Sequence, residues 1–129
     1  MNKARFIVIL IGVLLPYLSR LPNGIAWVNQ YLDTGIGGFF FIQTLNAITW
    51  GSVLAFSSIY SKPALLLLPA IFGFGFSAKW HFLTDLASDP QASFALIFIP
   101  IHSILYVGIG GLIGIFIEKI IIRKTNSKT

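Results

Sequence analysis

Cysteine is absent from this chain of 129 residues, and charged residues make up only 10% of it. Without cysteine the chain has no disulfides, thiolate metal ligands or cysteine nucleophile. Soluble domains carry about 25% charged residues, so the low charge argues against a separate soluble domain. Acidic residues are the scarcer charges, four against nine basic ones. The basic residues lie at the ends of apolar runs, which points to lipid head groups as their partners and not to nucleic acid.

Long uncharged stretches take up most of the chain, at residues 36–60, 63–78 and 91–117. About 20 apolar residues in a helix cross the hydrocarbon core of a bilayer. We therefore predict an all-α membrane protein, a single domain over residues 1–129 built as a bundle of four transmembrane helices. The expected spans are about 4–20, 36–60, 64–83 and 91–117, with a helical extension over 118–124 and a frayed tail at 125–129.

The first apolar run, residues 6–18, is short and follows Lys3 and Arg5, a layout that signal peptides share. We favour an uncleaved first helix, extended by Lys3 and Arg20 reaching to the head groups. Cleavage before Trp27 is the alternative, and it would leave three spans.

A short amphipathic helix is expected between the first and second spans. Residues 25–32 follow a turn at Asn23–Gly24 and repeat apolar side chains at helical spacing, with Trp27 and Tyr31 beside them. Trp and Tyr favour the head-group level, so this segment is predicted to lie at the interface and to end at Gly35.

Prolines mark the later helices. Asp89 and Pro90 form a favourable start for the fourth helix, since Asp caps helices and Pro suits their first turn. Pro69 and Pro100 are expected inside the third and fourth spans, where each would remove a hydrogen bond and kink its helix.

Basic residues predict the orientation. Four spans place seven of the nine at the end of the bundle that holds the termini, and only Arg20 and Lys79 toward the other end. This distribution predicts cytoplasmic termini in the inner membrane of a bacterium. Lys79 is expected to reach up to the head groups, with Trp80 anchoring the interface.

Glycines are frequent in the fourth span, at Gly108, Gly110, Gly111 and Gly114. Gly110 and Gly114 have the GxxxG spacing that lets helices approach closely in lipid. We expect them to pack against other helices of the same chain, and a dimer interface is the alternative.

Polar side chains inside the spans form the candidate site. Gln43, Asn46, Ser77, His81 and His102 fall at similar depths in three spans when counted at about 1.5 Å per residue. If their helix faces converge, they make a polar cluster in the outer half of the bundle. Interhelical hydrogen bonding is the simpler interpretation, and an outward-open binding cavity is the functional one.

A metal site is a weaker alternative. His81, Asp85 and His102 could supply ligands, but the sequence has no compact ligand motif, so neither metal nor cofactor is expected. Motifs for serine hydrolases, zinc proteases and phosphate binding are also missing, which argues against an enzyme.

The sequence therefore favours a non-catalytic interaction protein, either an accessory protein of a membrane complex or an immunity-type protein that blocks a toxin. The alternative is a small transporter or channel, which would need to oligomerise because four helices rarely enclose a pore. No charge lies near the middle of a span, which weakens ion-coupled transport.

Overall fold

The computed structural model describes residues 1–88 and 91–128, and it contains five α-helices, two 3-10 helices and no strand in that part of the chain. The helices are α1 (Asn2–Leu18), α2 (Ile25–Leu32), α3 (Gly35–Phe56), α4 (Leu67–Leu83) and α5 (Ala92–Asn126). The 3-10 helices are η1 (Leu21–Asn23) and η2 (Pro63–Leu66). Four segments, 2–23, 35–56, 63–83 and 92–126, are long and apolar enough to cross a membrane.

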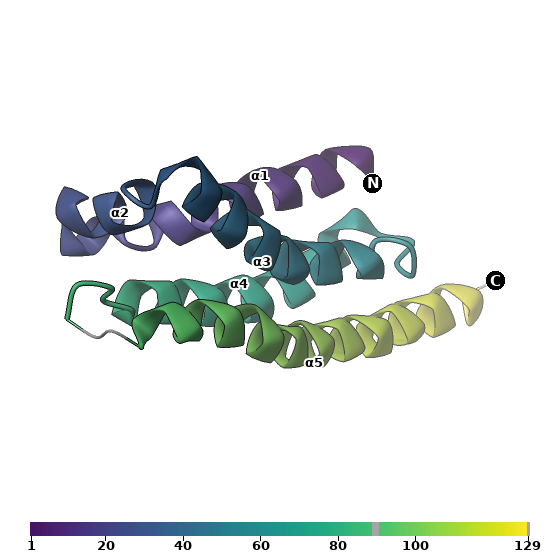
Figure 1. Cartoon of the computed structure of the whole chain (residues 1–129). Coiled ribbons are helices and arrows are strands. Elements are labelled where there is room, and N and C mark those ends of the chain that lie inside the picture. The colour runs from purple at the N-terminus through teal and green to yellow at the C-terminus, as the bar shows by residue number, and fades with distance from the viewer. Residues whose placement is uncertain (89–90, 129) are drawn as a thin grey trace.

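The four long helices lie side by side, with both termini at one end of the bundle and α2 at the other (Figure 1). The α4 and α5 helices form the most extensive pair, and α3 packs between α1 and α5. The main apolar core includes Val8, Val53, Leu66, Phe74 and Val107. Exposed side chains on the long helices are also mainly apolar, which is the pattern of helices surrounded by lipid.

Glycine controls the two turns at the α2 end. Gly24 has φ +101° and Gly35 has φ +77°, a region that L side chains rarely adopt. The expected turn at Asn23–Gly24 and the helix over 25–32 are confirmed. The expected role of Gly35 was wrong, since α2 ends at Leu32 and Gly35 begins α3.

The turn between α3 and α4, at the opposite end of the bundle, differs from the prediction. Pro69 lies inside the third candidate span, as predicted, but in the first turn of α4, where its missing N–H costs little, so the expected loss of a helical hydrogen bond was wrong. The second span was predicted to continue to Tyr60, but α3 ends at Phe56. The chain turns there, and Tyr60 Oη donates a hydrogen bond of 2.7 Å to Gly111 O of α5. That interhelical contact needs the turn, and hydropathy alone does not reveal it.

The fourth long helix continues well past its apolar part, to Asn126, and includes Pro100. The expected extension over 118–124 is therefore confirmed, and the helix also takes in Thr125 and Asn126 of the predicted tail. The predicted cap at Asp89 and Pro90 lies outside the described residues, and the helix begins at Ala92.

Candidate functional site

A fully buried arginine lies at the α2 end of the bundle. Arg20 follows α1 and has 0% of its surface exposed, so its expected extension to the head groups was wrong. Its Nε donates to Trp27 O at 2.8 Å, and its terminal nitrogens donate to His81 O at 2.8 Å, to Thr84 O and to Gln30 Oε1 at 2.6 Å. The guanidinium therefore joins the end of α1 to α2 and to the end of α4.

The acceptors explain why a cation is stable there. His81 and Thr84 lie at the C-terminal end of α4, where carbonyls lack helical partners and carry the negative end of the helix dipole. The guanidinium carbon also lies 4.0 Å from the ring centre of Tyr31 and 5.0 Å from that of Trp27, in cation–π geometry. Dipole, carbonyls and aromatic faces together replace the water that Arg20 has lost.

Gln30 connects this cation to a carboxylate. Its Oε1 accepts from Arg20 and from the backbone N–H of Leu86, while its Nε2 donates to Asp85 Oδ1 at 2.9 Å. Hydrogen bonds from Ser88 and Gln30, and then from the Ala87 N–H, hold the pKa of Asp85 below its usual value. The loop after α4 is thus fixed to α2 through one amide side chain.

Tyr31 and His81 complete the group, which we call the Arg20 cluster (Arg20, Trp27, Gln30, Tyr31, His81 and Asp85). Tyr31 Oη and His81 Nδ1 share a hydrogen bond of 2.8 Å, and both side chains are buried. Burial raises the pKa of Tyr31 to about 12, although the neighbouring Arg20 opposes the shift. Tyr31 therefore stays a neutral hydroxyl at physiological pH.

The predicted cluster of five polar residues is brought together only in part. Gln43 and Asn46 both turn toward α1: Gln43 Nε2 donates to Val13 O at 3.0 Å, and Asn46 Nδ2 donates to Gly12 O. Pro16 stands four residues after Gly12 and has no N–H to donate to that carbonyl. Asn46 thus supplies the donor that the proline removes.

Asn46 and His81 do meet, at a small cavity of about 10 Å³ that Thr49 also lines. That volume is at the lower limit for a single water molecule. Thr49 Oγ1 and Ser103 Oγ share a hydrogen bond of 2.7 Å in the same region of the bundle. Among the described residues, Asn46 Oδ1 and the buried Ser77 Oγ have no hydrogen-bond partner. The polar interior is therefore closed and narrow.

His102 lies apart from the other four. It is exposed on the outside of α5 and lines a separate hollow of about 360 Å³ between α4 and α5, together with Phe76, Trp80 and Tyr106. Its Nδ1 lies 2.9 Å from Phe98 O, and a carbonyl can only accept, so Nδ1 carries the proton. In this tautomer of the imidazole, Nε2 is the hydrogen-bond acceptor.

The glycines of α5 differ in their surroundings. A Cβ at Gly110 would lie 2.6 Å from Leu68 O of α4, while Cβ atoms at Gly111 and Gly114 would overlap the rings of Phe56 and Tyr60. Gly108, in contrast, has open space around it. The face with the GxxxG spacing is thus covered by α4 and by the end of α3, within the same chain.

The opposite end of the bundle is closed by two further polar contacts. Arg5 Nε donates to Ser57 Oγ at 2.8 Å, which ties α1 to the end of α3. Glu118 of α5 accepts hydrogen bonds from the Ser61 N–H, at 2.6 Å, and from Ser61 Oγ.

Lys79 lies exposed on α4.

Ser77 and His81, four residues apart on α4, do not form a hydrogen-bonded pair, since Ser77 Oγ has no hydrogen-bond partner among the described residues. His81 Nδ1 bonds to Tyr31, so that nitrogen is not available to Ser77. Within residues 1–88 and 91–128, no group of three His, Asp or Glu side chains could hold a metal ion. His81 and His102 line different hollows, so the suggested site with Asp85 does not assemble.

Comparison of the chain with family models, curated proteins and solved structures yields no match. The structure itself defines the class of protein: an all-helical chain with four helices that are long and apolar enough to span a membrane.

Sequence reasoning missed the Arg20 cluster almost entirely, although it included His81. Two signals were available. Arg20 and Asp85 are opposite charges predicted at the same end of the bundle, and Gln30 lies beside Tyr31 in the helix expected between them. Polar and aromatic side chains of this kind close to Arg20 favour burial of its guanidinium over exposure.

Proposed function

We propose that this chain is an integral membrane protein that crosses the bilayer four times, through α1, α3, α4 and α5, with both termini in the cytoplasm of a bacterium. The helix lengths and apolar surfaces support the spans. The basic residues support the orientation, because seven of the nine lie toward the end with the termini, namely Lys3, Arg5, Lys62, Lys119, Arg123, Lys124 and Lys128.

The topology can be tested directly because the chain has no cysteine. Single cysteines are placed at two exposed positions, Ala87 in the α4–α5 loop and Ser127 after α5. A membrane-impermeant maleimide should label A87C in intact spheroplasts, and S127C only after permeabilisation. Labelling of both positions in intact cells would contradict the four-span topology.

Within the membrane, we propose that the protein acts by binding a partner protein, as an accessory or immunity-type protein, and that the α4/α5 hollow is the binding face. The observation that carries this proposal is the exposed His102. It lies ten residues into α5, which corresponds to about 15 Å along the helix, near the middle of a bilayer. A polar ring facing lipid at that depth is costly, and a partner that donates to Nε2 would offset the cost.

The surroundings of His102 suit such a partner. Phe98 and Leu105 are exposed beside it, and the rings of Phe76 and Tyr106 stack with centres 4.4 Å apart. Aromatic side chains of this kind are enriched at the centres of protein interfaces. The polar side chains inside the bundle, in contrast, bond between helices, and the cavity that Asn46 and His81 line measures only about 10 Å³.

A photo-crosslinking experiment in cells tests the binding face. The photoreactive residue is placed at Leu105, which lines the hollow, and in the control at Leu112, which is similarly exposed elsewhere on α5. A discrete crosslinked product is expected from position 105 only, and His102→Leu should reduce its yield several-fold. Equal products from both positions, or no effect of the His102 substitution, would refute the proposal.

The transporter or channel alternative predicts a different result. Flux through liposomes that contain the purified protein, abolished by Asn46→Leu and by His102→Leu, would favour transport over partner binding. We expect no flux, since Asn46 lies inside the bundle and His102 outside it.

A further inference from the structure

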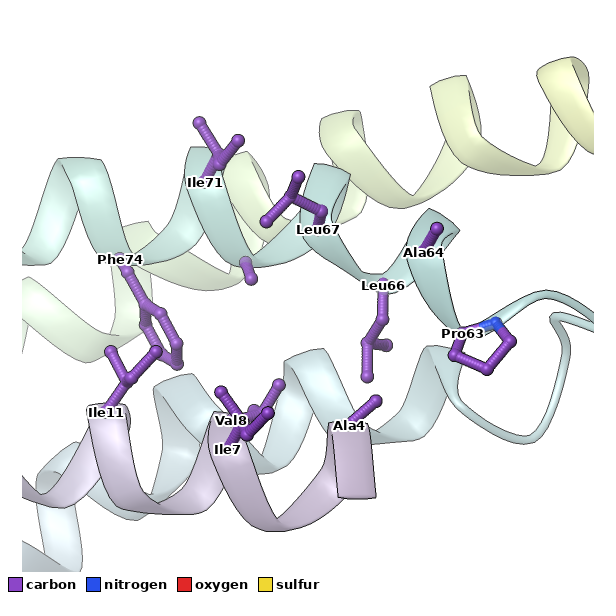
Figure 2. A pocket seen from close by; sticks show the side chains of 11 residues that line it. Ala4, Ile7, Val8, Ile11, Pro63, Ala64, Leu66, Leu67, Ile71 and Phe74 are labelled. Carbon is purple, nitrogen blue, oxygen red and sulfur yellow. The ribbon is translucent and has the colours of Figure 1, made fainter. Parts of the chain in front are cut away.

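A second hollow lies between α1 and α4, in the half of the bundle near the termini. It has a volume of about 390 Å³, and its lining includes Ala4, Ile7 and Ile11 of α1 with Pro63, Leu67 and Phe74 of η2 and α4. Figure 2 shows side chains of the two helices facing each other across the gap, with Phe74 and Ile11 at one end and Ala4 and Pro63 at the other. All eleven lining residues are apolar.

We propose that this groove binds one acyl chain of an anionic phospholipid, with the phosphate held by Lys3 and Lys62. The proposal rests on the membrane location proposed above, but not on the binding of a partner protein. The maleimide labelling tests that location separately, so a failure of either idea can be recognised.

The length of the groove favours a lipid chain over a partner helix. Along η2 and α4 it runs from Pro63 to Phe74, or roughly 18 Å at the rises of a 3-10 helix and an α-helix. The hydrocarbon core of a bilayer is about 30 Å thick, so the groove covers about one leaflet. A spanning partner helix would need a contact surface along most of the bundle, whereas an acyl chain ends at the midplane.

The volume of the groove agrees with the same occupant. At about 390 Å³ the groove is far larger than the cavity of about 10 Å³ inside the bundle, and it is large enough for an extended apolar chain. An acyl chain in a bilayer is already surrounded by apolar groups, so the groove adds shape and not selectivity.

Charge at the mouth of the groove supplies the selectivity. Lys62 immediately precedes the lining residue Pro63 and is exposed. Lys3 lines a neighbouring hollow that shares Ile7 with the groove, and it is exposed as well. Glu118 is the acid at this end of the chain; Ser61 donates two hydrogen bonds to it, and Lys62 adds a backbone hydrogen bond and an electrostatic attraction. Two accessible lysines beside an apolar groove at the basic end match an anionic head group.

Native mass spectrometry of the full chain in mild detergent can test this. The probes are phosphatidylglycerol and phosphatidylcholine with identical acyl chains. We expect wild-type protein to retain phosphatidylglycerol at least tenfold better than phosphatidylcholine, and the K3Q/K62Q double variant to retain the two equally. Equal retention by the wild type would mean non-selective lipid contact and would overturn the proposal.

A groove-filling variant tests the acyl-chain part. Ala70→Phe should abolish retention of both lipids, while the matched control Ala95→Phe, in the α4/α5 hollow, should leave retention unchanged. Retention by A70F at the wild-type level would refute the assignment of the groove. Circular dichroism monitors folding of each variant. If A70F does not fold, the exposed lysine variant still decides the outcome.

Discussion

Replacing the buried arginine should have the largest effect on stability. In Arg20→Met, an apolar side chain of similar length takes the place of the guanidinium and removes four hydrogen bonds to Trp27, Gln30, His81 and Thr84. Hydrogen bonds from a charged donor contribute about 1.5–3 kcal/mol each, or roughly 6–12 kcal/mol for four. The desolvation of a buried cation costs several kcal/mol and offsets much of this.

The expected net loss in the free energy of unfolding is therefore about 3–5 kcal/mol, the range typical of breaking a buried charged contact. For a domain of this size that lowers Tm by roughly 10–20 °C. Thermal unfolding in mild detergent, followed by circular dichroism, measures the shift. Arg20→Lys should lie in between, because lysine keeps the charge but lacks the planar fork that reaches several acceptors.

Arg5 provides the matched control for this experiment. It is a half-buried arginine at the other end of α1, and its contacts join it to Ser57 alone. Arg5→Met removes one good hydrogen bond from a charged donor and one long one, so it should cost about 1–2 kcal/mol. Equal Tm values for the Arg20 and Arg5 variants would refute the idea that the Arg20 cluster holds α1, α2 and α4 together.

Three further outcomes follow from the structure. Asn46→Leu should lower the free energy of unfolding of the wild type by about 1–3 kcal/mol. The loss should be far smaller in a Pro16→Ala background, because the backbone N–H of the substituted residue then donates to the Gly12 carbonyl. Equal losses in the two backgrounds of this double-mutant cycle would contradict the pairing. Gly110→Ala should cost about 1–3 kcal/mol, whereas Gly108→Ala, with open space around it, should be neutral or stabilising in the same unfolding assay. The pKa of Asp85 is lowered in the fold, so its contribution is present above its usual value of 3.8 and lost as the pH falls through the folded value. Unfolding measured from pH 6 down to about 3 should therefore show an acid-dependent loss that Asp85→Asn removes, and the same loss in both proteins would point to another acid.

Hydropathy predicted the four long helices because their length and apolar content depend on local sequence. The ends were less predictable. The α3 helix stops at Phe56 since Tyr60 and Ser57 have partners on other helices, and Pro69 falls at a helix start because η2 precedes it. Contacts of this kind depend on neighbours that are distant in the sequence.

The position of a polar residue along its helix was easier to predict than the neighbour that its side chain faces. Gln43 and Asn46 point to α1, and His102 faces outward, although all three lie at similar depths. A single sequence does not say which neighbour each helix face meets. The carbonyl of Gly12, freed by Pro16, was the available clue that α1 needs a donor from another helix.

Burial of Arg20 could not be predicted from hydropathy for a related reason. A cation at the end of an apolar run has the same sequence pattern whether it reaches the head groups or turns inward. The difference arises from the chain after it: Gly24 reverses direction at φ +101°, and α2 then places Trp27, Gln30 and Tyr31 over the end of α4. Long-range packing decides the outcome.

The two hollows use opposite halves of α4, and this separates their proposed roles. Residues up to Phe74 line the groove shared with α1, while residues from Phe76 onward line the hollow shared with α5. In the proposed four-span topology, the groove lies in the leaflet near the termini and the α4/α5 hollow in the leaflet near α2. A lipid chain and a partner protein can occupy them at the same time, because the lining residues do not overlap. If phosphatidylglycerol binding nevertheless changes the crosslinking yield at Leu105, the coupling must pass through α4 itself. The Arg20 cluster holds the far end of that helix, so Arg20→Lys should weaken such coupling.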